Sequence, residues 1–164
     1  MEREISAGGL VIRRQDRVWW LAAIELPDPV PATDTAKQVR QSKRKVTTCL
    51  PKGLVDAGEK PLEAALREVR EETGLTATPI LKLADIKYSY VRSWGDRARV
   101  FKIVSFYLLH YESGKIDDIS EGMRIEVARA KWIRLEDAPQ LLAYSGEKQM
   151  ARQALEYLAL HPEL

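Results

Sequence analysis

The spacing of apolar residues along the chain follows two periods, and each predicts a different kind of element. Between residues 62 and 73, apolar side chains recur every three or four positions, which is the period of one face of an α-helix. Other apolar segments are short, rich in Val, Ile and aromatic residues and bounded by turn residues, as strands are. The predicted strands cover residues 6–13, 18–26, 46–50, 80–92, 98–111 and 128–135.

Two further helices are predicted near the end of the chain, over residues 136–143 and 146–160. The apolar positions of the second helix are Met150, Ala154, Leu155 and Leu158. Residues 15–16 and 93–96 are predicted to turn the chain between neighbouring strands. Strands interleaved with helices that can cover both faces predict an α/β fold, an α/β/α sandwich around a mixed sheet.

The helix predicted at residues 62–73 has two chemically different flanks. Pro61 suits its first turn, and Gly74 is the expected stop. At about 100° per residue, the apolar flank consists of Leu62, Ala65, Leu66, Val69 and Thr73. Glu68, Glu71 and Glu72 lie together on another flank, because residues three and four apart are neighbours on a helix surface.

Three carboxylates this close repel one another unless a cation neutralises them. Hard cations with oxygen ligands, Mg²⁺ or Mn²⁺, suit this purpose. Zinc is not expected, because His110 and His161 are the only histidines and neither has another soft ligand near it in sequence. The alternative is a solvated acidic face paired with lysines. Gly53, Gly58 and Glu59 before the helix favour the metal site over this alternative.

The segment before the helix is predicted to fold back tightly over its start. Gly53 and Gly58 flank a short loop in which residues with a Cβ would be restricted. Lys52 precedes Gly53 and suits a phosphate oxygen bridged to the metal, although a lone lysine is often an ordinary surface residue.

Composition narrows the class of protein. A chain of 164 residues with 45% hydrophobic and 30% charged residues is typical of one globular domain, residues 1–164. The net charge of +2 does not indicate a nucleic-acid partner, and no apolar stretch is long enough to cross a bilayer. A first segment without signal-peptide layout and a single cysteine, Cys49, predict a cytoplasmic protein with a buried, inert thiol.

Residues 27–45 form a long connection between two predicted strands and are rich in proline and in basic side chains. The basic residues are Lys37, Arg40, Lys43, Arg44 and Lys45. A connection of this length suggests a function or disorder. We expect a mobile loop that binds polyphosphate, chiefly through residues 43–45. The alternative is a solvated linker without a role in binding.

The chain resembles the Nudix hydrolases, because residues 53–75 match the Nudix box G-x₅-E-x₇-R-E-U-x-E-E-x-G-U without a mismatch. The resemblance implies Mg²⁺- or Mn²⁺-dependent hydrolysis of a nucleoside diphosphate linked to a second group. It implies that Glu68 and Glu72 are the principal metal ligands and that Glu71 is a ligand or the general base. It also implies an ion pair between Glu59 and Arg67 in the helix region 59–74, and an approach of the Gly53 backbone to the metal.

Two further roles follow from the resemblance. Many members recruit a carboxylate six residues before a tryptophan, and Trp132 has Glu126 at that spacing, with Glu121 as a substitute. Dinucleoside polyphosphate hydrolases tend to have a tyrosine about fifteen residues past the box that stacks on adenine. Tyr90 has this position, and it could equally be a plain strand aromatic.

The entry Leu50-Pro51-Lys52-Gly53 resembles the dinucleoside polyphosphate and diphosphoinositol polyphosphate branches of the family. We therefore expect a hydrolase of dinucleoside polyphosphates, such as diadenosine tetra- to hexaphosphate, acting as a monomer or homodimer. The alternatives are a diphosphoinositol polyphosphate hydrolase and a hydrolase of oxidised nucleoside triphosphates. Outside the enzymes, the alternative is a nucleotide sensor, but sensors usually lose box carboxylates and this chain keeps them all.

Overall fold

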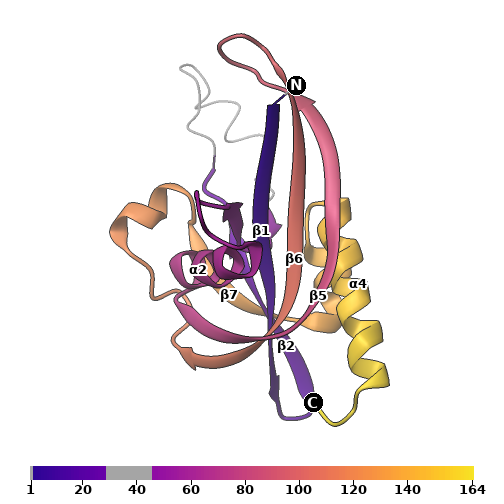
Figure 1. Ribbon diagram of the computed structural model, residues 1–164. Helices are drawn as coiled ribbons and strands as arrows, with labels where there is room; N and C mark the ends of the chain where they lie inside the picture. The colour runs from indigo at the N-terminus through magenta and orange to yellow at the C-terminus, as the bar shows by residue number, and fades with distance from the viewer. Residues whose placement is uncertain (1, 29–45) are drawn as a thin grey trace, which may run out of the picture.

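The computed structural model describes residues 2–28 and 46–164. Within these residues, seven strands form one sheet (Figure 1). The strands are β1 (Glu2–Gln15), β2 (Val18–Glu25), β3 (Thr48–Cys49), β4 (Lys52–Leu54), β5 (Leu75–Val91), β6 (Arg99–Gly114) and β7 (Arg129–Arg134). The basic residues between 29 and 45, including Lys43, Arg44 and Lys45, lie outside the described residues.

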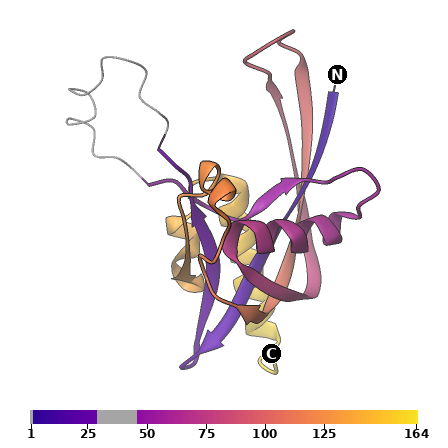
Figure 2. The same cartoon turned by 90° about the vertical axis from the view of Figure 1, so that its left-hand side faces the viewer.

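The sheet is mixed. Its strands follow the order β3-β2-β1-β6-β5, while β4 pairs with β1 and β7 pairs with β2. Among the described strands, β1 and β6 run parallel, and the pairs β1–β2, β1–β4, β2–β3, β2–β7 and β5–β6 are antiparallel. β5 and β6 form a long hairpin that extends with the start of β1 beyond the helices (Figure 2).

Helices cover both faces of the sheet: α2 (Pro61–Thr73) on one side and α4 (Ser145–Leu160) on the other (Figure 1). Successive side chains of β1 point to opposite faces, as a strand requires. Leu10 and Ile12 belong to the apolar cluster that contains Met150 of α4. Val11 belongs to the cluster that contains Val69 of α2. The predicted α/β/α sandwich is therefore confirmed.

Shorter helical segments connect the later elements. A 3₁₀ helix, η1 (Glu121–Ile125), precedes β7, and a 3₁₀ turn, η2 (Leu135–Asp137), leads into α3 (Ala138–Leu141). The prediction of one continuous helix over residues 136–143 is therefore wrong, because a 3₁₀ turn and a short α-helix share this segment. None of the helices in the described part of the chain has the length and apolar character needed to cross a membrane.

Other differences from the sequence prediction have a tertiary cause. The first turn is Asp16-Arg17 rather than 15–16, because Gln15 pairs with Val18 and both turn residues have positive φ, 52° and 65°. β5 begins at Leu75 instead of residue 80, since its pairing with β6 continues through irregular register past Pro79. β4 was not predicted, because its three residues become a strand only through their pairing with β1.

Candidate active site

Helix α2 begins and ends where its sequence indicates. Pro61 occupies the first turn, where a missing N–H is harmless, and the Glu63 carboxylate accepts a hydrogen bond from the Lys60 N–H at 3.3 Å. Gly74 closes the helix in the left-handed conformation at φ 83°, with its N–H donating to the Arg70 carbonyl at 2.9 Å. Both ends are therefore fixed, and the acidic flank has a defined orientation.

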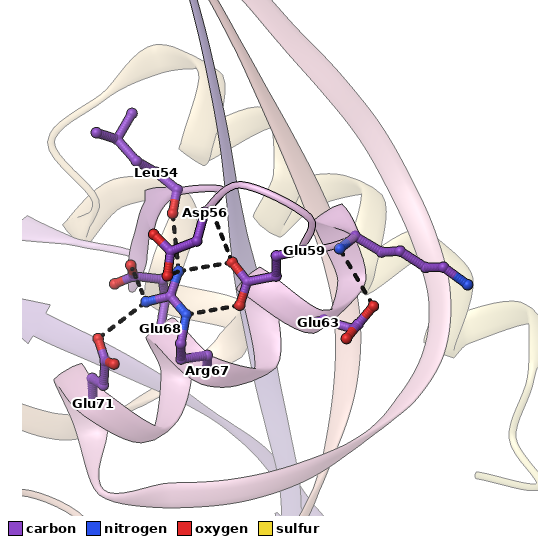
Figure 3. A network of polar contacts seen from close by, with 8 residues as sticks. Leu54, Asp56, Glu59, Glu63, Arg67, Glu68 and Glu71 are labelled. Carbon is purple, nitrogen blue, oxygen red and sulfur yellow. Dashed lines mark hydrogen bonds and ion pairs between the residues drawn. The ribbon is translucent and has the colours of Figure 1, made fainter.

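Arg67 is the centre of a polar network that joins α2 to the loop before it (Figure 3). Its Nε and Nη2 donate to the two carboxylate oxygens of Glu59 at 2.8 and 3.0 Å. Nη2 also donates to the Leu54 carbonyl at 3.0 Å. Nη1 donates to Glu68 Oε1 at 2.9 Å and to Glu71 Oε2 at 3.3 Å. The predicted Glu59–Arg67 pair is present in the structure as a two-pronged contact.

The electrostatics of this pair follow from its geometry. Hydrogen bonds from Arg67, and then one from the backbone N–H of Asp56, lower the pKa of Glu59 to about 2. The same contact with Glu59 raises the pKa of Arg67 above its ordinary value. Both groups stay charged at every physiological pH, so the pair works as a fixed clamp and not as a proton donor.

Gly53 allows β4 to lie directly against the acidic flank of α2. A Cβ built at Gly53 would lie 2.2 Å from the carboxylate carbon of Glu68. Real side chains do not approach this closely, so only glycine fits without moving Glu68. The pairing of Gly53 with Ala7 of β1 holds the β4 backbone in place.

The carboxylates of Glu68 and Glu72 are buried, whereas that of Glu71 is exposed. Burial raises the pKa of Glu68, despite the opposing effect of Arg67. Burial also raises the pKa of Glu72 to about 8, and the charges of Glu68 and Glu126 act in the same direction. The hydrogen bond that Glu72 Oε1 accepts from the Lys52 N–H, at 2.9 Å, only partly offsets this rise.

Glu126 reaches the same cluster from the other side. It caps the C-terminal end of η1, and its negative charge raises the pKa of both Glu68 and Glu72. Glu121, the substitute considered from the sequence, lies in the first turn of η1. Its negative charge helps to raise the pKa of Arg124 in the last turn of the same helix. The structure thus brings Glu126, rather than Glu121, to the box carboxylates.

The donor set fits a hard divalent cation. Buried carboxylates with raised pKa values gain stability from a nearby positive charge, and oxygen donors are those that Mg²⁺ and Mn²⁺ prefer. Within the described residues, no group of three His, Cys, Asp or Glu side chains is arranged to hold a metal ion. Arg67 engages Glu68 and Glu71, while Glu72 accepts from the Lys52 backbone N–H.

Two residues predicted to bind substrate have partners that their sequence positions did not indicate. The Lys52 ammonium forms an ion pair with Glu147 of α4 and lies 4.9 Å from the centre of the Tyr144 ring. The Tyr90 hydroxyl donates to Glu4 Oε1 at 2.9 Å. The backbone N–H of Lys52 therefore contacts the carboxylate of Glu72, while its side chain contacts Glu147 and Tyr144 at the start of α4.

A cavity of about 570 Å³ opens where the start of α4 meets the sheet. Its polar lining comes from Lys52, Lys87, Tyr88, Tyr144, Ser145 and Glu147. A second hollow, of about 540 Å³, lies between α2 and the η1 region and includes Arg67 and Glu71. The acidic flank of α2 thus borders the second hollow, while β4 connects this flank to the first.

Sequence reasoning missed Glu147, Tyr88 and Tyr144. A signal for Glu147 was present, because it lies three and four positions before Met150 and Ala151 on the apolar stripe of the last helix. A charged residue at such a position is normally paired. No comparable signal marks the two tyrosines, since only the packing of α4 on the hairpin brings them to one cavity.

Comparisons with known proteins agree with this geometry. The model of the NUDIX domain family matches residues 3–154. A protein described as mutator protein MutT4 of Mycobacterium tuberculosis (strain CDC 1551 / Oshkosh) is 34% identical over 156 residues, which is 94% of this chain and 56% of that protein. The RNA pyrophosphohydrolase of Bartonella clarridgeiae is 31% identical over 107 residues, 57% of this chain and 60% of that protein. The chain thus spans less than two thirds of either relative.

The asymmetrical bis(5'-nucleosyl)-tetraphosphatase of Rattus norvegicus is 31% identical over 114 residues, 68% of this chain and 72% of that protein. Among solved structures, an Ap4A hydrolase binary complex of C. elegans superposes with a TM-score of 0.64 at 20% identity, covering 95% of this chain and 98% of that one. That likeness shows the fold. The match of the family model over nearly the whole chain shows the family: the protein is a member of the Nudix hydrolases.

Proposed function

We propose that the protein is a Mg²⁺- or Mn²⁺-dependent pyrophosphohydrolase of dinucleoside polyphosphates. The observation that carries the proposal is the electrostatic effect of Glu126 on the two buried carboxylates of α2, Glu68 and Glu72, beside the exposed carboxylate of Glu71. Glu68, Glu71 and Glu72 come from one helix, and Glu126 caps the end of η1. The ligands proposed for the ion are these carboxylates and the backbone at Gly53.

The reaction assigns different tasks to the residues of the cluster. A bound divalent ion would supply neutralisation of the charge on the bridging phosphates. Glu71 is the proposed general base, because its carboxylate is exposed and can take a proton from water. The water oxygen bonds to phosphorus, the anhydride P–O bond breaks, and the leaving phosphate departs with the bonding electrons. Arg67, held by Glu59, fixes the orientation of Glu68 and Glu71.

The choice of substrate is supported by the relatives and by the basic segment. The relatives of the chain include an asymmetrical bis(5'-nucleosyl)-tetraphosphatase and an RNA pyrophosphohydrolase. Residues 43–45 supply positive charge for a long phosphate chain in the proposal. The match to a mutator protein keeps oxidised nucleoside triphosphates as an alternative, beside diphosphoinositol polyphosphates. The proposed compartment is the cytoplasm, whose reducing conditions suit the free, buried thiol of Cys49.

Product analysis over a substrate panel tests the proposal. The panel contains diadenosine tri- to hexaphosphates, an oxidised guanosine triphosphate and a diphosphoinositol polyphosphate, each with Mg²⁺ and with excess chelator. We expect the diadenosine substrates to have the highest kcat/KM and all turnover to end on chelation. A preference for either alternative would replace the substrate, whereas turnover in chelator would contradict the mechanism.

A further inference from the structure

The connection between β6 and β7 lies against the C-terminal end of α2. The backbone N–H of Asp117 donates to the carbonyl of Thr73, the last residue of that helix, at 2.9 Å. A Cβ built at Gly74 would lie 2.6 Å from the Asp118 carbonyl oxygen and 2.7 Å from that of Lys115, so the two segments meet backbone against backbone. The connection is therefore anchored to the helix that carries the box carboxylates.

Asp117 joins this anchor to the start of β7 and to η1. One oxygen of its carboxylate, Oδ1, accepts from the Ala130 N–H at 2.8 Å and from Arg124 Nη1 at 2.7 Å. Its backbone carbonyl accepts from Arg124 Nη2 at 3.0 Å. Asp117 thus contacts three elements: α2 through its N–H, β7 through its carboxylate, and η1 through its carboxylate and its carbonyl.

Arg124 holds the segment that carries Glu126 on both sides of that residue. In addition to its bonds to Asp117, its Nη1 donates to the Ala128 carbonyl at 3.2 Å. Glu126 lies between Arg124 and Ala128 in sequence, and its N–H donates to the Met123 carbonyl at 2.9 Å. The backbone before and after Glu126 is therefore fixed, and with it the point from which the Glu126 side chain extends.

Glu126 needs such support more than the other carboxylates of the proposed metal site do. After burial, its charge contributes to the raised pKa values of Glu68 and Glu72. The carboxylates of α2 share one helix, which keeps their spacing constant, whereas a carboxylate on a separate segment keeps its distance only if that segment is tied to the helix. Groups that orient a metal ligand in this way typically change metal affinity or activity by about 10- to 100-fold when they are removed.

We propose that the Asp117–Arg124 pair positions Glu126 for the reaction, by holding the η1 segment against the end of α2 so that the Glu126 carboxylate faces the carboxylates of the helix. Both are positioning residues that act through Glu126, without contact to metal or substrate. Their side chains are 36% and 34% exposed, so their charges contribute little to folding stability and their main effect is geometric. The proposal rests on the proposed function and adds to it two residues outside the Nudix box.

Binding of Mn²⁺ without substrate, followed by electron paramagnetic resonance, tests the pair separately from turnover. Asp117→Gly removes the carboxylate, and glycine readily adopts the left-handed backbone of this position, φ 74°. Arg124→Lys keeps the charge but lacks the guanidinium fork that reaches both Asp117 and the Ala128 carbonyl. We expect Mn²⁺ affinity to fall at least about 10-fold in both variants. Asp117→Asn, whose amide oxygen can still accept from Ala130 and Arg124, should lose no more than about 3-fold.

Asp96→Gly is the matched control. Asp96 also accepts from a backbone N–H, that of Ala98 at 3.0 Å, and pairs with an arginine, Arg92 at 3.5 Å, but it lies in the turn between β5 and β6. Its replacement should leave Mn²⁺ affinity at the wild-type value. Thermal unfolding establishes that each variant folds, and Arg124→Lys decides the outcome if Asp117→Gly does not fold. Unchanged Mn²⁺ affinity in the folded variants of the pair would overturn the proposal.

A double substitution with Glu126→Gln separates positioning from general support of the fold. Adding Asp117→Gly to Glu126→Gln should lower Mn²⁺ affinity by no more than about 2-fold further, because the positioned carboxylate is already absent. Losses that multiply in the double variant, or wild-type Mn²⁺ affinity in Glu126→Gln alone, would overturn the proposal. Hydrolysis of diadenosine substrates with unchanged Mn²⁺ affinity in the variants of the pair would refute the positioning role alone. The expected losses of Mn²⁺ affinity without hydrolysis of any panel substrate would refute the proposed function alone.

Discussion

Glu68 and Glu72 are buried carboxylates on a helix, an arrangement that costs free energy unless a cation or hydrogen bonds compensate for lost hydration. Arg67 partly compensates Glu68, and the backbone N–H and the charge of Lys52 partly compensate Glu72. The pKa of Glu72, raised to about 8, reflects the desolvation that these contacts leave uncompensated. At the scale of the residue, a further positive charge near Glu72 would therefore stabilise its ionised form.

This raised pKa predicts how stability depends on pH when metal is removed. The folded chain binds the Glu72 proton more tightly than the unfolded chain, whose carboxyl has a pKa near 4.5. The contribution is therefore fully present below pH 4.5 and is lost as pH rises towards 8, with a slope of up to about 1.4 kcal/mol per pH unit. Urea unfolding in chelator should show this decline, and Glu72→Gln should flatten it. Equal slopes in wild type and Glu72→Gln would contradict it, with the exposed Glu71→Gln as the matched control.

Cys49 gives a second prediction at this scale. Burial, and then the charge of Glu147, raises the pKa of the Cys49 thiol to about 12, so the native thiol is protonated at pH 8. We expect iodoacetamide to label the native protein at least about 100-fold more slowly than the urea-unfolded protein, because the thiolate is the reactive form. Fast labelling of the native protein, followed by mass spectrometry, would show that the segment around β3 opens readily.

At the scale of elements, the central contact is the approach of β4 to α2. Gly53→Ala would place a methyl group 2.2 Å from the Glu68 carboxylate carbon, so the Glu68 carboxylate must move away from β4. We expect destabilisation of about 1–3 kcal/mol from overpacking and a fall in kcat of at least about 10-fold from misplacement of Glu68.

Gly122→Ala is the matched control for this substitution, because a Cβ there meets no atom within 4 Å. Thermal unfolding and steady-state kinetics on both variants separate a specific clash from a general effect of replacing glycine. Wild-type turnover in Gly53→Ala would show that Glu68 tolerates a shift. The close approach of Gly53 to Glu68 would then have no role in catalysis.

Elements that depend on local sequence could be predicted, whereas elements that depend on long-range pairing could not. Helix α2 and its acidic flank depend on local spacing, capping and a stop residue, and the structure has them where the sequence places them. β4 is a strand because β1 is beside it, and the longer β5 depends on β6. Long-range pairing of this kind leaves no local periodicity to read.

The residues of the site also differ in whether local sequence or the fold places them. The box side chains were predicted because one helix carries most of them, and Glu126 was placed through a spacing to Trp132. Glu147 is 75 positions from Glu72, and only the packing of α4 on the sheet unites them through Lys52. Partners so far apart in sequence are set by the fold, and the local sequence around Lys52 does not indicate them.

At the scale of the whole molecule, the two helices divide the work across the sheet. α2 and α4 lie on opposite sides of the sheet (Figure 1). Gly53 of β4 lies against Glu68 of α2, and Lys52 of β4 lines the cavity at the start of α4. In the proposed function, residues 43–45 supply positive charge for the phosphate chain of the substrate.

Neutralising Lys43, Arg44 and Lys45 together tests this contribution. We expect KM to rise more for diadenosine hexaphosphate than for the triphosphate, by about 10-fold against about 2-fold, because longer chains present more charge. The difference should shrink at high salt. Equal changes in KM for both chain lengths would favour a solvated linker, and Lys148→Gln offers a control for loss of positive charge elsewhere.

The most direct test of the central claim is the turnover of a diadenosine polyphosphate with Mg²⁺ by Glu71→Gln and Glu72→Gln. Glu63→Gln, on the same helix but away from the cluster, is the control, and thermal unfolding confirms that each variant folds. The account predicts kcat at least about 100-fold lower for Glu71→Gln and Glu72→Gln, as for the loss of a general base or a metal ligand, and near wild type for Glu63→Gln. Near-normal turnover by a folded Glu71→Gln or Glu72→Gln protein would contradict it.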